Sequence, residues 1–354
     1  MGRPSVTRQT WTAFASAIVF VGLAILLVVV PVPFVSWTPG GARNTLGNVG
    51  NEPIIKVQGI QTYPTTGQLD MAIISITPAD GRLSLPQALL TYWLPRSDTL
   101  PRDSVYAPGK SAAQVEAEDA DLMETAQDDA VVAALRADDL PVTEMPVIYS
   151  VTVGGPAHKR LLPGDLVVAV DGVPTPDEES VGRLIREHRV GEQVRFVVLR
   201  KRVRTDVTVT TAQSTAQPGV PIVGITLSTG YRYQPQISFD LGQRIGGPSA
   251  GLVFALAIYD KITEGPLLGG MHVAGTGQIT PNGDVGAIGG IQEKIASAEK
   301  DGATVFLFPA ANCDDLAGVK TKMTLIDVAT LRAAVDALHT MGTPGGGSRP
   351  PTCS

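Results

Sequence analysis

The stretch RIGGPSAGLV, residues 244–253, places a serine in a glycine-rich turn directly before an apolar run. Glycine allows close backbone approach and tight turns, so we expect this turn to lead into a helix. Ser249 then has three interpretations. It could cap the helix, it could be part of an anion cradle at the helix N-terminus, or it could be a nucleophile. The nucleophile interpretation requires a base and oxyanion donors nearby.

A base for Ser249 has to come from elsewhere in the chain, and Lys294 is the candidate with suitable surroundings. It lies early on an expected helix, where Ile291 and Ile295 mark a face that we expect to be buried. Burial disfavours the charged ammonium, so a buried lysine can be neutral near pH 7. By pattern alone, a surface lysine with a packed stem is the commoner interpretation. His272 lies in an expected strand and is interpreted as packed in the sheet.

Composition and motifs exclude several other functions. The chain of 354 residues has a formal net charge of −6 and a pI near 5.3, which argues against nucleic-acid binding. Residues 104–111 end like a phosphate-binding loop but lack its first glycine and a preceding strand, so we expect no nucleotide. Four scattered histidines and the pair Cys313 and Cys353 indicate neither a metal site nor a disulfide framework. We expect no cofactor.

The N-terminal segment has the composition of a membrane span. The 18 residues 13–30 are nearly all aliphatic, and as a helix they would cover about 27 Å, close to the thickness of a hydrocarbon core. A cleaved secretory signal is the alternative, but no good cleavage site follows. Arg3 and Arg8 precede the span, so the positive-inside rule predicts that residues 1–10 are cytoplasmic, 11–34 are an anchor and the remainder is exported.

After the anchor, helices and strands mix without strict alternation, which indicates an α+β fold. The expected segments are a β-rich segment at 40–100, an acidic helix with a solvated face at 111–139, a strand-rich domain at 140–215, a second domain at 219–342 and a disordered tail at 343–354.

Residues 146–211 resemble a PDZ domain. The resemblance rests on Gly154 to Pro156, on the turn Pro163 to Asp165 and on Asp171-Gly172. PDZ domains bind extended peptide ends by strand addition, so the resemblance implies a peptide-binding module. No carboxylate-binding loop of the Gly-Leu-Gly-Phe type precedes Val147, so a spacer or gating module is the alternative.

The pairing of GGPSAG with the lysine of GGIQEK, 45 residues after the serine, resembles the proteolytic domain of Lon-type serine peptidases. The likeness continues through TGQIT, NGDVGAIGG and GATVFLFP, and covers residues 220–341. It implies a serine-lysine dyad in which Ser249 is the nucleophile and Lys294 is the general base. It also implies that Thr276 is the hydrogen-bond partner that orients the lysine.

The combination of anchor, PDZ-like module and Lon-like domain resembles the bacterial membrane-anchored, PDZ-containing Lon-like proteases. The resemblance implies an ATP-independent serine endopeptidase without an ATPase domain, single-pass in the cell membrane, with its protease domain outside the cytoplasm. The expected substrates are unfolded or flexible protein segments, and a homo-hexamer is expected from relatives. Gly247 and Ala250, beside the serine, are expected to support the oxyanion site. The alternative is a catalytically inactive, PDZ-bearing membrane scaffold.

A further expectation concerns the layout of the domains. Residues 220–245 are short for the strands that precede the serine in this fold. We therefore expect residues 50–94 to supply the missing part of the sheet and the PDZ-like module to be an insertion.

Overall fold

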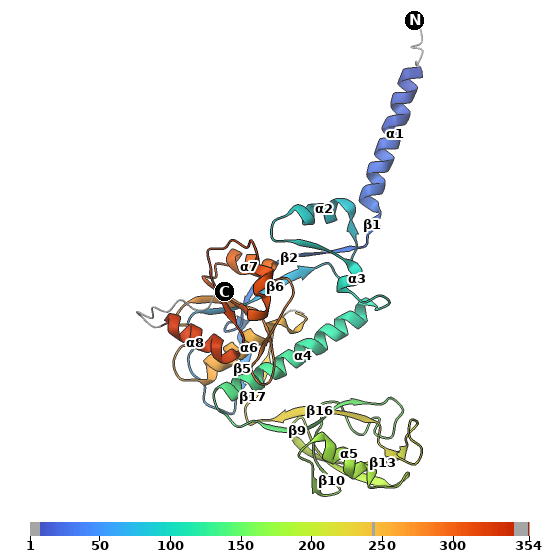
Figure 1. Cartoon of the computed structure of the whole chain (residues 1–354), viewed down its shortest axis with the longest axis vertical. Helices are drawn as coiled ribbons and strands as arrows, with labels where there is room; N and C mark the ends of the chain where they lie inside the picture. Colours follow the sequence, from blue (N-terminus) through green and yellow to red (C-terminus); the bar gives the residue numbers. More distant parts are fainter. Residues whose placement is uncertain (1–7, 243–244, 343–352, 354) are drawn as a thin grey trace. The chain divides into compact units, whose positions relative to one another are not determined.

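A computed structural model describes residues 8–242, 245–342 and 353 of the chain (Figure 1). By internal contacts these residues form two compact units. One unit is Asp139–Pro235, and the other combines the residues before it with those after it.

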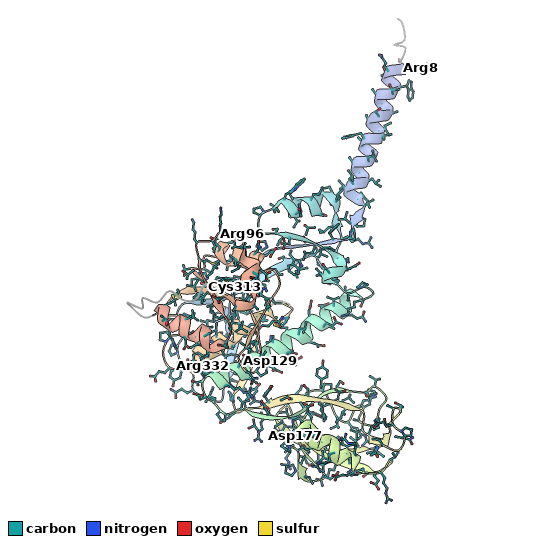
Figure 2. The ribbon with its side chains drawn as sticks, in the orientation of Figure 1. Arg8, Arg96, Asp129, Asp177, Cys313 and Arg332 are labelled. Atoms are coloured by element: carbon teal, nitrogen blue, oxygen red, sulfur yellow. A yellow bond between two sulfur atoms is a disulfide. The ribbon has the colours of Figure 1, made fainter. Side chains whose placement is uncertain are left out.

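The larger unit begins with helix α1 (Arg8–Val29), whose one charged residue is Arg8 at its start. The helix has 22 residues and none of them is buried, so its aliphatic side chains project outward along its whole length (Figure 2). At 1.5 Å per residue it is about 33 Å long. By length and composition α1 is able to cross a membrane. Most of the expected cytoplasmic tail, residues 1–7, lies outside the described residues.

A six-stranded mixed sheet forms the centre of this unit, in the order β22-β21-β18-β6-β2-β8. The first four strands run parallel, and β2 is antiparallel to both of its neighbours. The strands are β2 (Phe34–Asn44), β6 (Gln68–Ile76), β8 (Asp98–Pro101), β18 (His272–Gly275), β21 (Val305–Pro309) and β22 (Thr324–Val328). Half of the sheet therefore comes from before residue 139 and half from after residue 235.

Three helices after residue 250 pack with this sheet: α6 (Gly251–Ile262), α7 (Ile291–Lys300) and α8 (Leu331–Gly342). Every residue of β21 is buried, which is typical of a parallel strand covered on both faces. On α7, Ile291 and Ile295 are buried as expected, and they pack in one cluster with the β21 phenylalanines. This packing fixes α7, and with it Lys294, against the sheet.

Helix α4 (Ala112–Ala137) lies along α6 in the same unit (Figure 1). Ser111 caps its N-terminus through a capping box with Gln114. The C-terminal half of α4 is largely buried, including the continuous run Ala130–Leu135. The expected acidic helix is therefore present, but it is a packed element of the unit and its acidic residues lie mainly in its first half.

The smaller unit has its own sheet, in the order β13-β12-β10-β9-β16 with β11 (Val173–Pro174) beside β10, and a separate core. Its other elements are β9 (Thr143–Val151), β10 (Leu166–Val170), α5 (Glu178–Arg186), β12 (Gln193–Arg200), β13 (Val203–Thr210) and β16 (Ile225–Arg232).

The position of β16 differs from our expectation, which placed residues 219–342 together. It pairs with β9 along its whole length instead. Close approach explains part of this pairing: a Cβ at Gly230 would lie 2.6 Å from the Cβ of Val147, so glycine is needed there.

Cys313 and Cys353 form a disulfide, which corrects our expectation that these two cysteines make no disulfide framework. They are 40 residues apart in sequence, and no local pattern indicates the pairing. Cys313 lies in the 3₁₀ segment η2 (Ala310–Leu316), which follows β21 (Figure 2). The expected disordered tail, residues 343–354, lies outside the described residues apart from Cys353.

Replacing Cys313 by serine is expected to lower the free energy of unfolding by about 2–4 kcal/mol, because the crosslink restricts the unfolded chain. Urea denaturation of the chain in detergent measures the change. Cys353→Ser should give the same loss, and the double variant should lose no more. Equal stability of the wild-type chain with and without a reductant would contradict the pairing.

Candidate active site

Ser249 lies in a 3₁₀ turn, η1 (Pro248–Ala250), that leads directly into α6. Gly247 precedes the turn with φ 87°, in the left-handed region that other residues rarely adopt. Gly251 follows it, where a Cβ would lie 2.8 Å from a methyl carbon of Ile279. The glycines of GGPSAG are thus needed to bend the chain and bring it close to its neighbours, and they place the serine at a helix start.

Lys294 lies in the second turn of α7, and only 3% of it is exposed. Its Nζ donates a hydrogen bond to Oγ1 of Thr276 at 3.1 Å. The Thr276 hydroxyl in turn donates to the backbone carbonyl oxygen of Ser249 at 3.0 Å. The amide of Gly277 donates to the same oxygen at 2.8 Å. The residues expected to form the site, Ser249, Thr276 and Lys294, are therefore connected by hydrogen bonds.

The ionisation of Lys294 is shifted toward the neutral form. Burial lowers the pKa of Lys294 to about 8, and the negative charge of Glu293 partly opposes this shift. Glu293 is itself only 1% exposed, and burial raises its pKa to about 7, with a further contribution from Asp98. A lysine with a pKa near 8 has a useful fraction of free amine at neutral pH, as a general base requires.

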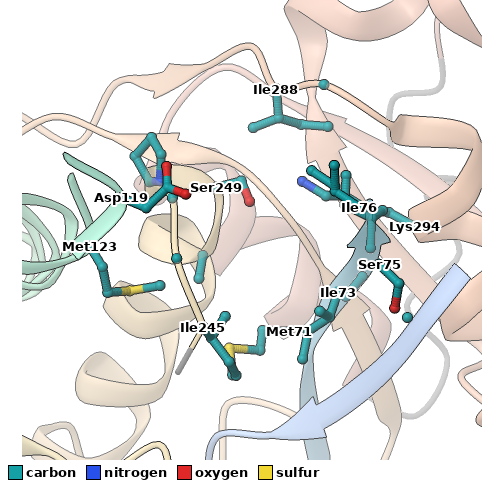
Figure 3. Close-up of a pocket in the computed structure, with 18 of the residues that line it drawn as sticks. Met71, Ile73, Ser75, Ile76, Asp119, Met123, Ile245, Ser249, Ile288 and Lys294 are labelled. Carbon is teal, nitrogen blue, oxygen red and sulfur yellow. The ribbon is translucent and has the colours of Figure 1, made fainter. Parts of the chain in front are cut away.

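Ser249 and Lys294 line the same pocket, which has a volume of about 520 Å³. Figure 3 shows the serine hydroxyl and the lysine amine turned toward the same space. Gly247 and Ala250 also line this pocket. Its other walls combine polar and apolar groups, and the larger apolar side chains are Trp37, Met71, Ile73, Ile74, Ile76, Met123, Ile245 and Ile288.

Helix α4 forms part of the pocket wall, which no pattern in the sequence predicts. Asp119 and Met123 of α4 line the pocket together with Ser249 (Figure 3). The amide of Gly247 donates to the carbonyl oxygen of Asp119 at 3.3 Å. A Cβ at Gly246 would lie 2.8 Å from the Cβ of Asp119, so a larger residue there would displace the helix. The acidic residues of α4 gave no sequence signal for this contact, because it joins distant parts of the chain.

His272 lies apart from this pocket. Its Nε2 is 2.7 Å from Oδ2 of Asp70, where β18 runs beside β6. Among the described residues, one group brings potential metal-ligand atoms together, namely Cys313, Asp327 and Cys353, and both of its sulfurs are used in the disulfide.

Comparison with protein families matches both parts of the chain. Residues 244–339 match the family model of the Lon protease (S16) C-terminal proteolytic domain, and residues 122–211 match the PDZ domain. With the mixed helix and strand structure, these matches define the class of the protein. It combines a Lon-type proteolytic domain with a PDZ domain and carries an apolar N-terminal helix.

Curated relatives are similar in the proteolytic part. The Lon protease of Clostridioides difficile (strain 630) is 40% identical over 84 residues, which are 23% of this chain and 10% of that protein. The Lon protease of Roseiflexus castenholzii is 43% identical over 70 residues, which are 20% of this chain and 8% of that protein. The chain thus spans about a tenth of the length of these relatives. They support a Lon-like protease.

Solved structures of PDZ domains are similar to part of this chain. The PDZ domain of an SdrC-like protein from Listeria monocytogenes is 24% identical and covers 23% of this chain and 86% of that one, with a TM-score of 0.22. The corresponding domain from Listeria innocua is 21% identical and covers 23% and 92%, also with a TM-score of 0.22.

Proposed function

We propose that the chain is a membrane-anchored serine endopeptidase that cleaves unfolded or flexible protein segments without ATP. In this proposal Ser249 is the nucleophile and Lys294 is the general base. The observation that carries it is the hydrogen-bonded connection from Lys294 through Thr276 to Ser249 beside one pocket, within a segment similar to the Lon proteolytic domain.

The first half of the reaction forms an acyl-enzyme. Neutral Lys294 accepts the proton of the Ser249 hydroxyl while Oγ bonds to the carbonyl carbon of the substrate peptide. Because Thr276 accepts one N–H of the amine, the lysine is oriented and its lone pair remains available to the serine. The carbonyl electron pair moves to oxygen, which accepts hydrogen bonds from the backbone N–H groups of Ser249 and Ala250 in the η1 turn.

The second half returns the proton and releases the product. The Lys294 ammonium donates its proton to the leaving amine as the C–N bond breaks. Lys294 then takes a proton from water, whose oxygen attacks the ester carbonyl, and the proton passes to the Ser249 oxygen as the acid product leaves. Because the same lysine donates and accepts, its pKa near 8 suits both steps.

The disulfide supports the exported location in this proposal. Disulfides persist in oxidising compartments and are rare in the reducing cytosol. With α1 as a signal anchor, Arg3 before it and Arg8 at its start, the N-terminus is cytoplasmic and both units lie outside. A homo-hexamer belongs to the proposal by resemblance alone, and the mass of the detergent-solubilised chain in solution tests it.

The purified chain should release peptides from a labelled, unfolded protein without any added nucleotide, also in the presence of a chelator. The Ser249→Ala variant prepared in parallel should release none. The same rate from both preparations would mean that the cleavage comes from a contaminant. The inactive-scaffold alternative predicts no cleavage by either.

The pH dependence of cleavage should follow the ionisation of Lys294. Because the base must be neutral, kcat/KM is expected to rise about tenfold per pH unit below a midpoint near 8 and to level off above it. Glu293→Gln removes a negative charge that favours the ammonium, so this variant should shift the midpoint to lower pH. A midpoint near 10, the value of an exposed lysine, would show that Lys294 is not the buried base.

A further inference from the structure

Helix α2 (Leu85–Trp93) presents an apolar face to the solvent, in contrast to the other helices of the larger unit after α1. Pro86, Leu89, Leu90 and Trp93 follow the spacing i, i+3, i+4, i+7, which places them on one face. Leu90 is 60% exposed and Trp93 is 72% exposed. The opposite face is packed, with Ala88 and Thr91 buried. Such an exposed group of large apolar side chains on one helix face is typical of an interaction surface.

The composition of this region fits a lipid surface. Residues 83–95 contain no charged side chain, and Arg82 and Arg96 flank them. Tyr92 is 68% exposed beside Trp93, and such amphipathic rings are favoured at the membrane–water interface. A short helix with aromatic and leucine side chains on one face can lie in the plane of that interface.

The position of α2 is fixed to the end of α1. Strand β1 (Pro31–Val32) directly follows α1 and pairs with β7 (Leu83–Ser84), which directly precedes α2. Helix α1 also contacts both β7 and α2, and Figure 1 shows α2 beside the C-terminal end of α1. An α1 that crosses a bilayer therefore brings the apolar face of α2 to the level of the membrane surface.

Helix α2 is also tied to the elements of the candidate active site. After α2, Arg96 forms an ion pair with Glu299 of α7 at 2.5 Å, and α7 carries Lys294. Trp37 of β2 lines the pocket and lies only eight residues after the end of α1. Even a fully extended chain of that length covers at most about 29 Å. The pocket therefore lies near the end of α1.

We propose that α2 lies in the lipid–water interface and holds the active site close to the membrane surface, so that the substrates are polypeptide segments near the bilayer. This inference rests on the proposed function in one respect, because it requires α1 to be the membrane anchor. Lipid is the occupant of the apolar face, since α2 contacts α1 and both helices expose large apolar side chains.

Fluorescence of the full chain in vesicles tests this placement. The vesicles contain phosphatidylcholine and phosphatidylglycerol, with bromine atoms on the acyl chains about 5–10 Å below the headgroups. Three variants each carry Trp37 and one reporter tryptophan. The reporter is Trp11 in α1, Trp93 in α2, or a control tryptophan introduced by Leu122→Trp. Leu122 lies on α4 and is 46% exposed. A variant that lacks Trp11 and Trp93 gives the background of Trp37.

We expect brominated lipid to lower the emission of Trp11 and of Trp93 about twofold and to leave the Leu122→Trp control unchanged. Quenching of Trp11 without quenching of Trp93 would overturn the inference while the anchor stands. A blue-shifted but unquenched Trp93 would assign the apolar face to a second copy of the chain. Quenching of the Leu122→Trp control would overturn the inference that lipid contacts α2 specifically. An unquenched Trp11 would show that the anchor itself is wrong, and the inference with it.

Discussion

Replacing Ser249 by alanine is expected to abolish cleavage of an unfolded protein, with a loss of about 10³-fold or more in kcat. The variant lacks the oxygen that would bond to the substrate carbonyl. Lys294→Ala should lose as much. Among the described residues that line the pocket, Asp119 is the other ionisable group, but Lys294 is the one connected to Ser249 through Thr276. Lys294→Arg should be equally inactive, since a guanidinium does not become neutral in proteins. Initial rates of peptide release measure each loss.

Lys300→Ala is the matched control for these substitutions. Lys300 lies on the same helix as Lys294, at its exposed C-terminal end, so its loss should leave the rate of cleavage near that of the wild type. Circular dichroism establishes that each variant is folded. Full activity in Ser249→Ala or in Lys294→Ala would end the dyad account.

A chain shortened to begin at Pro218 is expected neither to fold cooperatively nor to cleave. Strand β18 would lose β6, its parallel neighbour, and the sheet would keep only three of its six strands. The buried apolar face of α6 would also lose α4, which packs along it. Urea denaturation followed by circular dichroism detects the missing cooperative transition.

A chain that begins at Pro31 is the control for this truncation, because it lacks α1 but keeps every strand of the sheet. We expect it to unfold in one cooperative transition of the larger unit and to retain cleavage of a soluble unfolded protein. Cooperative folding and cleavage by the chain that begins at Pro218 would show that the N-terminal strands are dispensable.

The sequence predicts best what short-range chemistry determines. The glycine turn before Ser249, the helix that carries Lys294 and the apolar helix α1 each follow from local patterns of residues. Thr276 was expected from a resemblance to a known domain, and in the structure it bonds both to Lys294 and to the carbonyl of Ser249. Their joint catalytic role remains a prediction.

Features that depend on contacts between distant parts of the chain could not be predicted from the sequence. The strand at residues 225–232 has an ordinary strand pattern, and no local sequence feature indicates that it pairs with β9. The acidic residues of α4 indicate a solvated helix, although Asp119 and Met123 reach the pocket. The pairing of Cys313 with Cys353 depends on where the fold places Cys353, 40 residues further along the chain. In each case tertiary structure, rather than propensity, selects the partner.

The most direct test of the account is mass spectrometry of the chain after reaction with a serine-directed fluorophosphonate. The account predicts a single adduct on Ser249, formed together with the loss of cleavage, and much slower labelling in Lys294→Ala because the hydroxyl then lacks its base. An adduct on another residue that accompanies the loss of activity, or continued cleavage by chains that are fully modified at Ser249, would contradict it.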